Sequence, residues 1–302
     1  MTDKVKADNK IALIIPYFKG GAFIGNLLDS IETATQDCAA VDVIFVDNDK
    51  DGITLPVQQS DINITVLRTR PGIGFGRACN IGLAHVSKGS YSHVFLLNQD
   101  VILGPFSLDT LIEAANKHPT SLITPVSKTY DMAEIPEWYA NRYFAGKSLE
   151  SEFVELENIA GNCLGGTTEA VEHAGYLDPI FHMYEEDRDY ITRLRESGQS
   201  LILATRATIG HYNASVSKQG DERNDKKWKR DSAIKFAIRH GSVGEMTTYW
   251  VRSYGHAVKR LWPGEVLRYV LTDLSMIFSF KKIRSARNIQ TRAVKQIKQD
   301  LI

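Results

Sequence analysis

Short apolar segments of strand length alternate with amphipathic segments over the first third of the chain. Runs of consecutive apolar residues predict buried strands at 11–18, 41–48, 64–68 and 93–100. Apolar residues at helical spacing predict helices at 24–35 and 77–86. Strands and helices in this rhythm are typical of an α/β domain with a mainly parallel sheet flanked by helices. Ligands of such sheets bind at the carboxyl ends of the strands.

Polar residues follow each predicted strand. The first strand ends in Pro16-Tyr17, the second in Asp47-Asn48-Asp49 and the fourth in Asn98-Gln99-Asp100. Because the carboxyl ends of parallel strands meet at one edge, these side chains could converge on one crevice. Each of these residue types is also common in ordinary turns. The prediction of a binding site therefore depends on their occurring together at the strand ends, and not on any single residue.

The third strand is followed by a glycine-rich loop, from Pro71 to Arg77. Its glycines are Gly72, Gly74 and Gly76, whereas a dinucleotide-binding fingerprint would need its third glycine where Arg77 stands. A looser interpretation is that the glycines let the backbone approach a ligand and that the next helix offers free N–H groups to an anion. A plain turn from strand to helix is the alternative.

A second group of polar residues lies at the start of a predicted helix, from about Glu185 to Ser197, which Gly198 ends. Asp187 shares a helical face with Ile191 and Leu194, and a carboxylate on the core-facing side indicates a cleft. Such a carboxylate can act as a general base. The alternative is that acidic residues in a first helical turn only complement the helix dipole.

Between these two groups, the stretch 127–158 is rich in aromatic and acidic residues. Trp138, Tyr139 or Tyr143 could stack on a bound ligand, or they could be ordinary core or surface residues. Further on, an apolar segment predicts a late strand that ends at His211. The polar segment 215–231 has the composition of a mobile loop that could fold over a bound ligand.

Composition narrows the class of protein. The chain has 302 residues, of which 43% are hydrophobic, and 36 basic residues balance 36 acidic ones. This balance gives no electrostatic case for nucleic acid as a partner. The three cysteines are widely spaced, which favours free thiols in a reducing compartment. The polar N-terminus lacks the apolar stretch of a signal peptide, and we therefore expect a cytoplasmic protein.

The pattern becomes helical from about residue 232, which predicts a domain at 1–231 and a helical extension at 232–302. Between Lys281 and Lys298 lie seven basic residues and no acidic ones, interleaved with isoleucine and valine. Such helices could lie on an anionic membrane surface. A solvated helix or a homodimer contact is the alternative.

The ordered motifs of the chain resemble glycosyltransferase family 2, particularly its bacterial rhamnosyltransferase-like members, over about residues 11–215. The motifs are IIPYF, FVDNDK, RPGIGFGRACNIGL, VFLLNQD, IAGNCLGG, FHMYEEDRDY and GHYNAS. The resemblance implies a GT-A fold with a Rossmann-like sheet, a nucleotide-diphospho-sugar donor, Mg2+ or Mn2+, and inversion at the anomeric carbon.

The resemblance also implies roles for residues at matching positions. Pro16 and Tyr17 open the nucleotide site, and Asp47 contacts the base or the ribose. The other residues counted with the donor site are Gly74, Arg77, Asn80, Asn98 and Gln99.

The segment NQD falls where the family carries Asp-x-Asp, so the resemblance makes Asp100 a metal ligand. Asn98 departs from the family pattern: its amide oxygen can coordinate a hard cation but brings no second negative charge. A histidine after the late strand can ligate the metal or the diphosphate in related enzymes, which makes His211 a second candidate. A structural histidine at a strand end is the alternative reading of His211.

The segment Glu186-Asp187-Arg188-Asp189 matches the family's acidic motif, with Asp187 at the position of the catalytic base and Glu186 as a second candidate. The resemblance favours a deoxythymidine-diphosphate rhamnose donor, with a UDP-hexose or UDP-galactofuranose as the alternative. The acceptor implied is a glycan or lipid-linked glycan of a surface polysaccharide, reached on the cytoplasmic face of the inner membrane. Two other classes stay open: another nucleotide-binding α/β enzyme, and a non-catalytic protein that binds nucleotide sugars.

Overall fold

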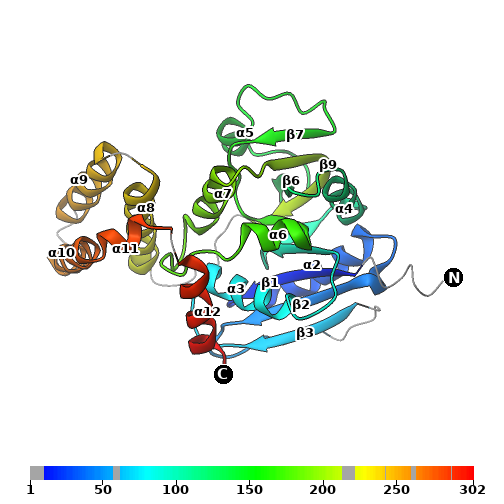
Figure 1. Cartoon of the computed structure of the whole chain (residues 1–302), viewed down its shortest axis with the longest axis horizontal. Helices are drawn as coiled ribbons and strands as arrows, with labels where there is room; N and C mark the ends of the chain where they lie inside the picture. The colour runs from blue at the N-terminus through cyan, green and yellow to red at the C-terminus, as the bar shows by residue number, and fades with distance from the viewer. Residues whose placement is uncertain (1–9, 57–61, 213–221, 242, 260–262, 287) are drawn as a thin grey trace.

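One nine-stranded sheet runs through the body of the chain in a computed structural model (Figure 1). The structure describes residues 10–56, 62–212, 222–241, 243–259, 263–286 and 288–302. The first four strands are parallel neighbours in the order β3-β2-β1-β4. They are β1 (Ile11–Tyr17), β2 (Val41–Asp47), β3 (Asn63–Arg68) and β4 (His93–Leu97). All four lie where the apolar runs predict them.

The rest of the sheet is mixed, and continues from β4 in the order β8-β6-β9-β5, with β7 also paired to β9. Strand β8 is antiparallel to β4 and β6, whereas β6 and β9 are parallel to each other. These strands are β5 (Val101–Leu103), β6 (Leu122–Thr129), β7 (Phe153–Leu156), β8 (Cys163–Thr167) and β9 (Leu201–His211). Because only β5, β7 and β8 run against the others, the expected mainly parallel sheet is confirmed.

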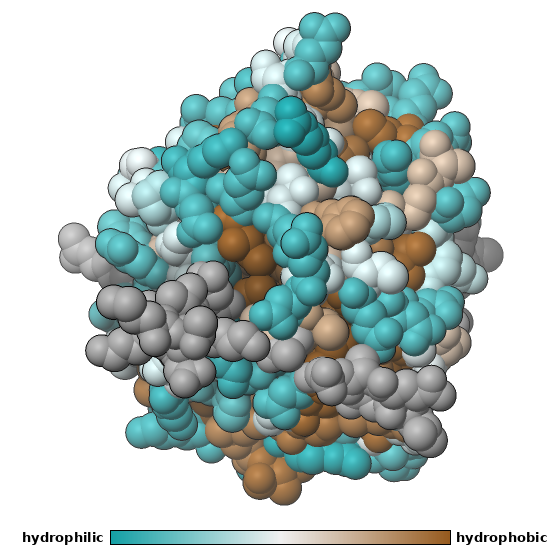
Figure 2. Space-filling model, turned by 90° about the vertical axis from the view of Figure 1, so that its right-hand side faces the viewer, coloured by the Kyte–Doolittle hydropathy of each residue, from teal (hydrophilic) through white to brown (hydrophobic). Residues whose placement is uncertain are grey.

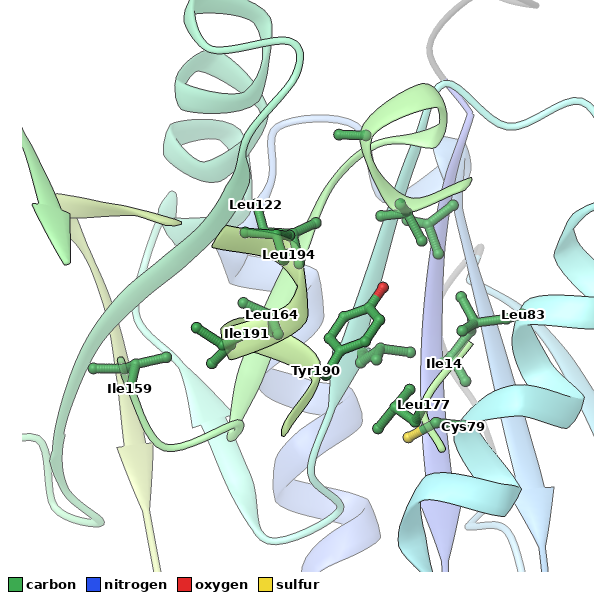
Figure 3. Close-up of a cluster of buried hydrophobic side chains, with 14 of the residues drawn as sticks. Ile14, Cys79, Leu83, Leu122, Ile159, Leu164, Leu177, Tyr190, Ile191 and Leu194 are labelled. Atoms are coloured by element: carbon green, nitrogen blue, oxygen red, sulfur yellow. The ribbon is translucent and has the colours of Figure 1, made fainter. Parts of the chain in front are cut away.

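Helices cover both faces of the sheet. On one face, α2 (Gly21–Ala34) and α4 (Ser107–Lys117) bury residues such as Ile24, Leu27 and Leu111. On the other face lie α3 (Phe75–Val86), α6 (Thr168–Ala174) and α7 (Glu186–Glu196). Tyr190 of α7 packs there near Leu177 and α3, and Ile191 lies near Leu164, as Figure 3 shows. Two short elements, η1 (Cys38–Ala40) and α5 (Glu137–Tyr143), complete the body.

The C-terminal part is helical, as predicted. It contains α8 (Glu222–His240), α9 (Val243–Lys259), α10 (Pro263–Phe278), α11 (Phe280–Arg284) and α12 (Ile289–Asp300). Helices α8 to α11 cluster beside the body, and α12 lies against it (Figure 1). The expected mobile loop at 215–231 is wrong for residues 222–231, which begin α8, and its first part lies outside the described residues. The helix is supported by pairs of opposite charge at a spacing of four, Asp225 with Lys229 and Lys227 with Asp231.

Helix α12 returns the end of the extension to the body. The Arg77 guanidinium binds the Asp300 carboxylate, and the Arg70 N–H donates to the Asp300 carbonyl oxygen at 2.9 Å. Thr69 and Leu301 form an antiparallel bridge beside β3. Residues near the C-terminus therefore pack on helix α3, within the segment expected to form the first domain.

The surface is mixed in polarity. Seen from the side of the N-terminus it is mostly hydrophilic, with apolar residues in separate patches (Figure 2). Among the described residues, no helix has both the length and the apolar character needed to cross a membrane.

Candidate functional site

The carboxyl ends of β1 and β2 are joined directly by hydrogen bonds. The Asn48 backbone N–H and side-chain amide both donate to the Tyr17 carbonyl oxygen, at 3.0 and 2.9 Å. The Gly72 N–H then donates to the Asn48 carbonyl oxygen at 2.8 Å, which attaches the glycine-rich loop to the same place. We call this side of the sheet the carboxyl edge. The ends of β1 and β2 and the glycine-rich loop are therefore adjacent, whereas a crevice formed by all the strand ends stays a prediction.

Gln99 ties the end of β4 to the loop after β1. Its side-chain oxygen accepts from the Phe18 N–H at 2.9 Å, and its side-chain amide donates to the Phe18 carbonyl oxygen at 2.8 Å. Gly20 lies so close that an added Cβ would come within 2.2 Å of the Gln99 side-chain oxygen. Both polar ends of Gln99 are thus engaged by the chain itself, and the side chain positions the β1 loop.

Asp47 is fully buried and organises the loop that follows β2. Its carboxylate accepts N–H groups of Asp49 and Ile53, at 3.1 and 3.0 Å, and lies 3.1 Å from the Arg68 guanidinium. Burial, followed by the charges of Asp49 and Asp47, raises the pKa of the Tyr17 hydroxyl above its ordinary value. Pro16 lies near the end of β1, paired with Val46, so it is part of the carboxyl edge. Contact of Asp47 with a nucleotide stays a prediction.

Three further residues expected at the donor site are engaged by other parts of the chain. A Cβ at Gly74, whose φ is +92°, would lie 2.1 Å from the His182 carbonyl oxygen. The Asn80 amide bonds both the N–H and the carbonyl of Leu177, at 2.9 and 2.8 Å. Arg77 binds Asp300, as described above. Gly74 and Asn80 hold the segment before α7 against α3, and Arg77 holds α12. Direct contact of these three residues with a donor stays a prediction.

Asp100 and His211 are brought together at the carboxyl edge, although they are far apart in the sequence. Val101 pairs with His211 between β5 and β9, and this register places the His211 imidazole 3.4 Å from the Asp100 carboxylate. Asp100 is buried at 7% exposure, and its carbonyl oxygen accepts from the Tyr212 N–H. Asn98 directly follows β4, two residues before Asp100, and is partly exposed.

This set of donors fits a hard divalent cation. Carboxylate and amide oxygens suit Mg2+ and Mn2+, and imidazole suits several divalent metals. Within the described residues, no group of three or more histidine, cysteine or acidic side chains could hold a metal. Mg2+ commonly keeps water and substrate phosphates in its coordination shell, so one carboxylate with one or two further donors is sufficient when a diphosphate is present.

Asp187 lies at the same edge through the turn that precedes β8. Its carboxylate accepts the Gly161 N–H at 2.9 Å and the Arg188 N–H at 2.7 Å. The Asn98 N–H donates to the Asn162 carbonyl oxygen at 2.9 Å, which joins this turn to the end of β4. Gly161 is required here, because a Cβ would lie 2.7 Å from the Asp187 Cβ. Asp187 is partly exposed and held in a defined orientation.

The backbone before α7 is strained. Tyr184 and Glu185 both have left-handed conformations, with φ of 66° and 64°, which are uncommon for residues other than glycine. Glu185 also pairs with Arg188 at 3.2 Å. Such strain persists only where the surroundings impose it, and it is common at functional sites. The left-handed backbone at Tyr184 and Glu185 sets the direction of the first turn of α7, which contains Glu186 and Asp187.

Glu186 faces a different environment from its neighbour Asp187. It is buried at 6% exposure beside Gly76 of α3, and one of its carboxyl oxygens has no hydrogen-bond partner. Burial, followed by the nearby charge of Asp187, raises the pKa of Glu186 to about 8. Glu186 is therefore mostly protonated at neutral pH. A protonated carboxyl facing α3 is poorly suited to removing a proton from an acceptor.

The raised pKa of Glu186 predicts a pH dependence of stability. Since the unfolded carboxyl releases its proton near its ordinary pKa of 4.5 and the folded one near 8, the folded state binds more protons between these values. Stability therefore falls as the pH rises through this window. We expect the free energy of unfolding of the wild type to drop, relative to Glu186→Gln, by at most about 4 kcal/mol. Urea unfolding at several pH values measures this difference, and parallel curves for the two proteins would contradict it.

Asp189 and Asp178 form a buried ionic cluster that was not predicted from the sequence. Asp189 lies 2.8 Å from Arg193, 2.7 Å from Arg239 and 2.9 Å from His240. Burial alone would raise the pKa of Asp189, but the hydrogen bond from His240 and the charges of Arg193 and Arg239 lower it to about 2. Asp178 binds Arg239 at 2.6 Å and Arg292 at 2.7 Å in α12. The cluster attaches α8 and α12 to the segment that carries Asp187.

The aromatic residues that were candidates for contact with a ligand differ in how far they are buried. Tyr139 is buried at 2% exposure and packs on Tyr143 with 4.8 Å between ring centroids, so Tyr139 belongs to the core. Trp138 is 52% exposed and could contact another molecule.

Comparison with known proteins identifies the family. The sequence model described as "Glycosyl transferase family 2" matches residues 12–175, more than half of the chain. The chain belongs to glycosyl transferase family 2. The matched segment contains β1 to β4, the carboxyl edge and the turn at Gly161, whereas α7 and His211 lie beyond it. The activity class expected from the motifs, a glycosyltransferase, is therefore confirmed.

Two curated relatives of this glycosyltransferase come from Mycobacterium tuberculosis, strains CDC 1551 / Oshkosh and H37Rv. Both are named N-acetylglucosaminyl-diphospho-decaprenol L-rhamnosyltransferase. Each is 24% identical over 265 residues, which cover 77% of this chain and 86% of the relative.

Solved structures confirm the expected GT-A fold. GalNAc-T7 with UDP, GalNAc and Mn2+ aligns with a TM-score of 0.54 at 12% identity, over 84% of this chain and 58% of that one. Staphylococcus aureus TarS 1-349 in complex with UDP aligns with a TM-score of 0.50 at 10% identity, over 96% of this chain and 89% of that one.

Proposed function

We propose that this glycosyltransferase transfers a sugar from a nucleotide-diphospho-sugar to a hydroxyl of a lipid-linked glycan, with inversion at the anomeric carbon. The proposal rests on the environment of the Asp187 carboxylate. This carboxylate is partly exposed, held by the N–H groups of Gly161 and Arg188, and joined through the turn at Asn162 to the strand end that carries Asp100.

Asp187 supplies the general base of this reaction. It accepts the proton of the acceptor hydroxyl as that oxygen attacks the anomeric carbon, while the bond from this carbon to the diphosphate oxygen breaks on the opposite side. A single displacement of this kind inverts the anomeric configuration. Glu186 stays protonated beside Asp187, which limits like-charge repulsion at the start of α7.

Asp100, His211 and Asn98 would hold the Mg2+ or Mn2+ of this reaction. When bound, such an ion stabilises the charge that develops on the departing nucleoside diphosphate. The contact between Asp100 and His211 supports the assignment, because it places an acidic and an imidazole donor at the end of β4. With a single carboxylate in the set, metal binding should depend on the diphosphate for further oxygen ligands.

The curated relatives support the choice of donor and acceptor. Their name describes a rhamnosyl group and an acceptor that carries N-acetylglucosamine on a diphospho-decaprenol. We infer that the donor here is deoxythymidine-diphosphate rhamnose and that the acceptor is a polyprenyl-diphosphate-linked sugar of a surface polysaccharide. Such an acceptor would bring the enzyme to the cytoplasmic face of the inner membrane.

Turnover of a panel of donors tests this function. We expect dTDP-rhamnose to release dTDP slowly in the presence of Mn2+ or Mg2+, and UDP-hexoses and UDP-galactofuranose to release UDP far more slowly. The released rhamnose should first appear in the inverted configuration by NMR. Release from a UDP-sugar alone would correct the donor, and specific donor binding without turnover, even with a lipid-linked acceptor, would indicate a non-catalytic protein.

A further inference from the structure

Helix α10 leaves most of its apolar side chains exposed, whereas Tyr269 and Met276 are buried on its inner side together with Asp273. The exposed side chains recur at spacings of three and four residues, as on one face of a helix. Their exposures reach 60% at Leu267, 59% at Leu271, 58% at Ile277 and 88% at Phe278. This apolar face of α10 consists of Leu267, Val270, Leu271, Leu274, Ile277 and Phe278.

The opposite side of α10 is held by polar contacts inside the protein. Asp273 is buried and accepts hydrogen bonds from Arg230 at 2.5 Å and Tyr254 at 2.7 Å. Arg268 donates to the Asn224 side chain at 2.9 Å. A surface helix of a water-soluble domain normally buries its apolar stripe and exposes its polar one. Because α10 buries Asp273 and leaves a continuous stripe of large apolar side chains exposed, we infer that this stripe meets a nonaqueous surface.

Positive charge borders the apolar face. Lys281, Lys282 and Arg284 of α11 are exposed directly after Phe278 and Phe280. Between residues 266 and 286, Asp273 is the one acidic side chain, and it is buried. Apolar residues flanked by lysine and arginine are typical of helices that lie in the interface of an anionic membrane.

A basic hollow of about 310 Å³ adjoins the same helix, between α8, α10 and α11. Its lining includes three lysines and three hydroxyl residues, namely Lys227, Lys235, Lys282, Thr272, Ser275 and Ser279. Asp231 also lines it and pairs with Lys227, whereas Lys235 donates to the Ile180 carbonyl oxygen at 2.7 Å. The Thr272 hydroxyl donates to the Arg268 carbonyl oxygen at 2.9 Å. The hollow therefore has an excess of positive charge and the hydroxyl donors of Ser275 and Ser279, which suit a phosphate group.

We propose that the apolar face of α10 inserts into an anionic membrane surface and that the adjoining basic hollow binds the phosphate of a lipid headgroup. Thr272 and Ser275 lie on α10 and Ser279 directly follows it, so insertion of the apolar face would place the hollow near the level of the headgroups. The inference rests on the proposed function in one respect, because a lipid-linked acceptor is reached at such a surface. The sequence suggested a membrane contact by the basic segment 281–298. Because Ile289, Ala293 and Ile297 of α12 are buried against the body, we assign this contact to α10 and α11 instead.

A second copy of the chain fits this face less well than a membrane does. In a two-fold contact, the same patch is used by both partners. Two apolar faces packed in this way would also bring two sets of Lys281, Lys282 and Arg284 toward each other. Lipid phosphates neutralise these charges, whereas a second copy repeats them.

Flotation of the full chain with vesicles tests the membrane contact. We expect it to float with vesicles of phosphatidylcholine and phosphatidylglycerol in equal parts, and less with phosphatidylcholine alone. The variant Leu271→Gln/Leu274→Gln/Phe278→Gln should partition at least about tenfold less, since the lost burial of three large apolar side chains exceeds the energy of a tenfold change. Trp138→Gln, which removes an exposed apolar residue of the body, should float like the wild type.

Three results would overturn the membrane contact. In one, the wild type does not float with anionic vesicles. In another, the triple variant floats equally well. In the third, sedimentation shows a dimer that the triple variant converts to a monomer, without flotation of either. Unfolding curves and donor turnover without vesicles separate this question from folding and from the proposed function, because both should be unchanged in the triple variant.

Lys227→Ala/Lys282→Ala tests the basic hollow. We expect this variant to bind less well to vesicles that contain a phosphate-bearing lipid. A loss confined to phosphatidylcholine vesicles with polyprenyl diphosphate assigns the hollow to the acceptor's diphosphate, whereas an equal loss with phosphatidylglycerol assigns it to membrane phosphates in general. Unchanged binding to both kinds of vesicle would overturn the role of the hollow.

Discussion

Replacing Asp187 by asparagine should lower kcat for sugar transfer by roughly a hundredfold to ten-thousandfold, because the amide cannot accept the proton of the acceptor hydroxyl. Asparagine keeps the shape of the side chain, and its oxygen can still accept the Gly161 N–H that now binds the carboxylate at 2.9 Å, whereas its NH2 group cannot accept the Arg188 N–H. We therefore expect donor affinity to stay close to that of the wild type and thermal stability to fall slightly. Steady-state kinetics, with donor binding measured by calorimetry, separate the two effects.

Glu186→Gln is the matched comparison for this result. The Glu186 carboxyl is buried against α3, and its pKa of about 8 keeps it mostly protonated at neutral pH. Removing a charge that is mostly absent should change kcat only a few-fold. A large loss of kcat in Glu186→Gln together with near-normal activity in Asp187→Asn would exchange the roles of the two residues.

Replacing Asp100 by asparagine should weaken metal-dependent donor binding by at least about tenfold, because it removes the carboxylate from the proposed ligand set. Donor affinity measured in EDTA should change little. Calorimetric titration of a nucleoside diphosphate, with and without Mn2+, measures both quantities. His211→Ala should give a smaller loss of the same kind, since its imidazole lies 3.4 Å from the Asp100 carboxylate.

Asp42→Asn is the control for Asp100→Asn. Asp42 is a buried carboxylate near the start of β2, and it binds Lys10 and Tyr91, both at 2.7 Å. Its replacement should reduce stability without changing how donor affinity depends on Mn2+. Equal Mn2+ dependence in Asp100→Asn and the wild type would contradict the assignment of Asp100.

The parts of the fold that rest on local pattern could be predicted from the sequence. Strands β1, β2 and β4 are runs of mostly buried apolar residues, β3 is a partly exposed apolar run, and α7 shows its helical period through Ile191 and Leu194. The strand-end groups at Asn48 and Asp100 could be placed at one edge because parallel strands share a direction. The antiparallel strands β5, β7 and β8 were not predicted, since they are short and their pairing is set by distant partners.

Long-range side-chain contacts could not be predicted in the same way. Arg77 and Asp300 are 223 residues apart, and nothing in the local pattern around Arg77 indicates its partner. The same is true of Asp178 with Arg239 and of Asn80 with Leu177. The spacing of four between Asp189 and Arg193 was one readable sign of the ionic cluster. Motif matching places residues near a site, but these contacts determine which of them are free to meet a ligand.

Sugar transfer itself tests the central claim most directly. The full chain, dTDP-rhamnose, Mn2+ and a short-chain polyprenyl-diphosphate-linked N-acetylglucosamine are incubated together, and the lipid product is analysed by mass spectrometry. The account predicts one added deoxyhexose in the wild-type reaction, none in EDTA and almost none with Asp187→Asn. Equal product from the wild type and from Asp187→Asn, or no transfer from any donor of the panel, would contradict it.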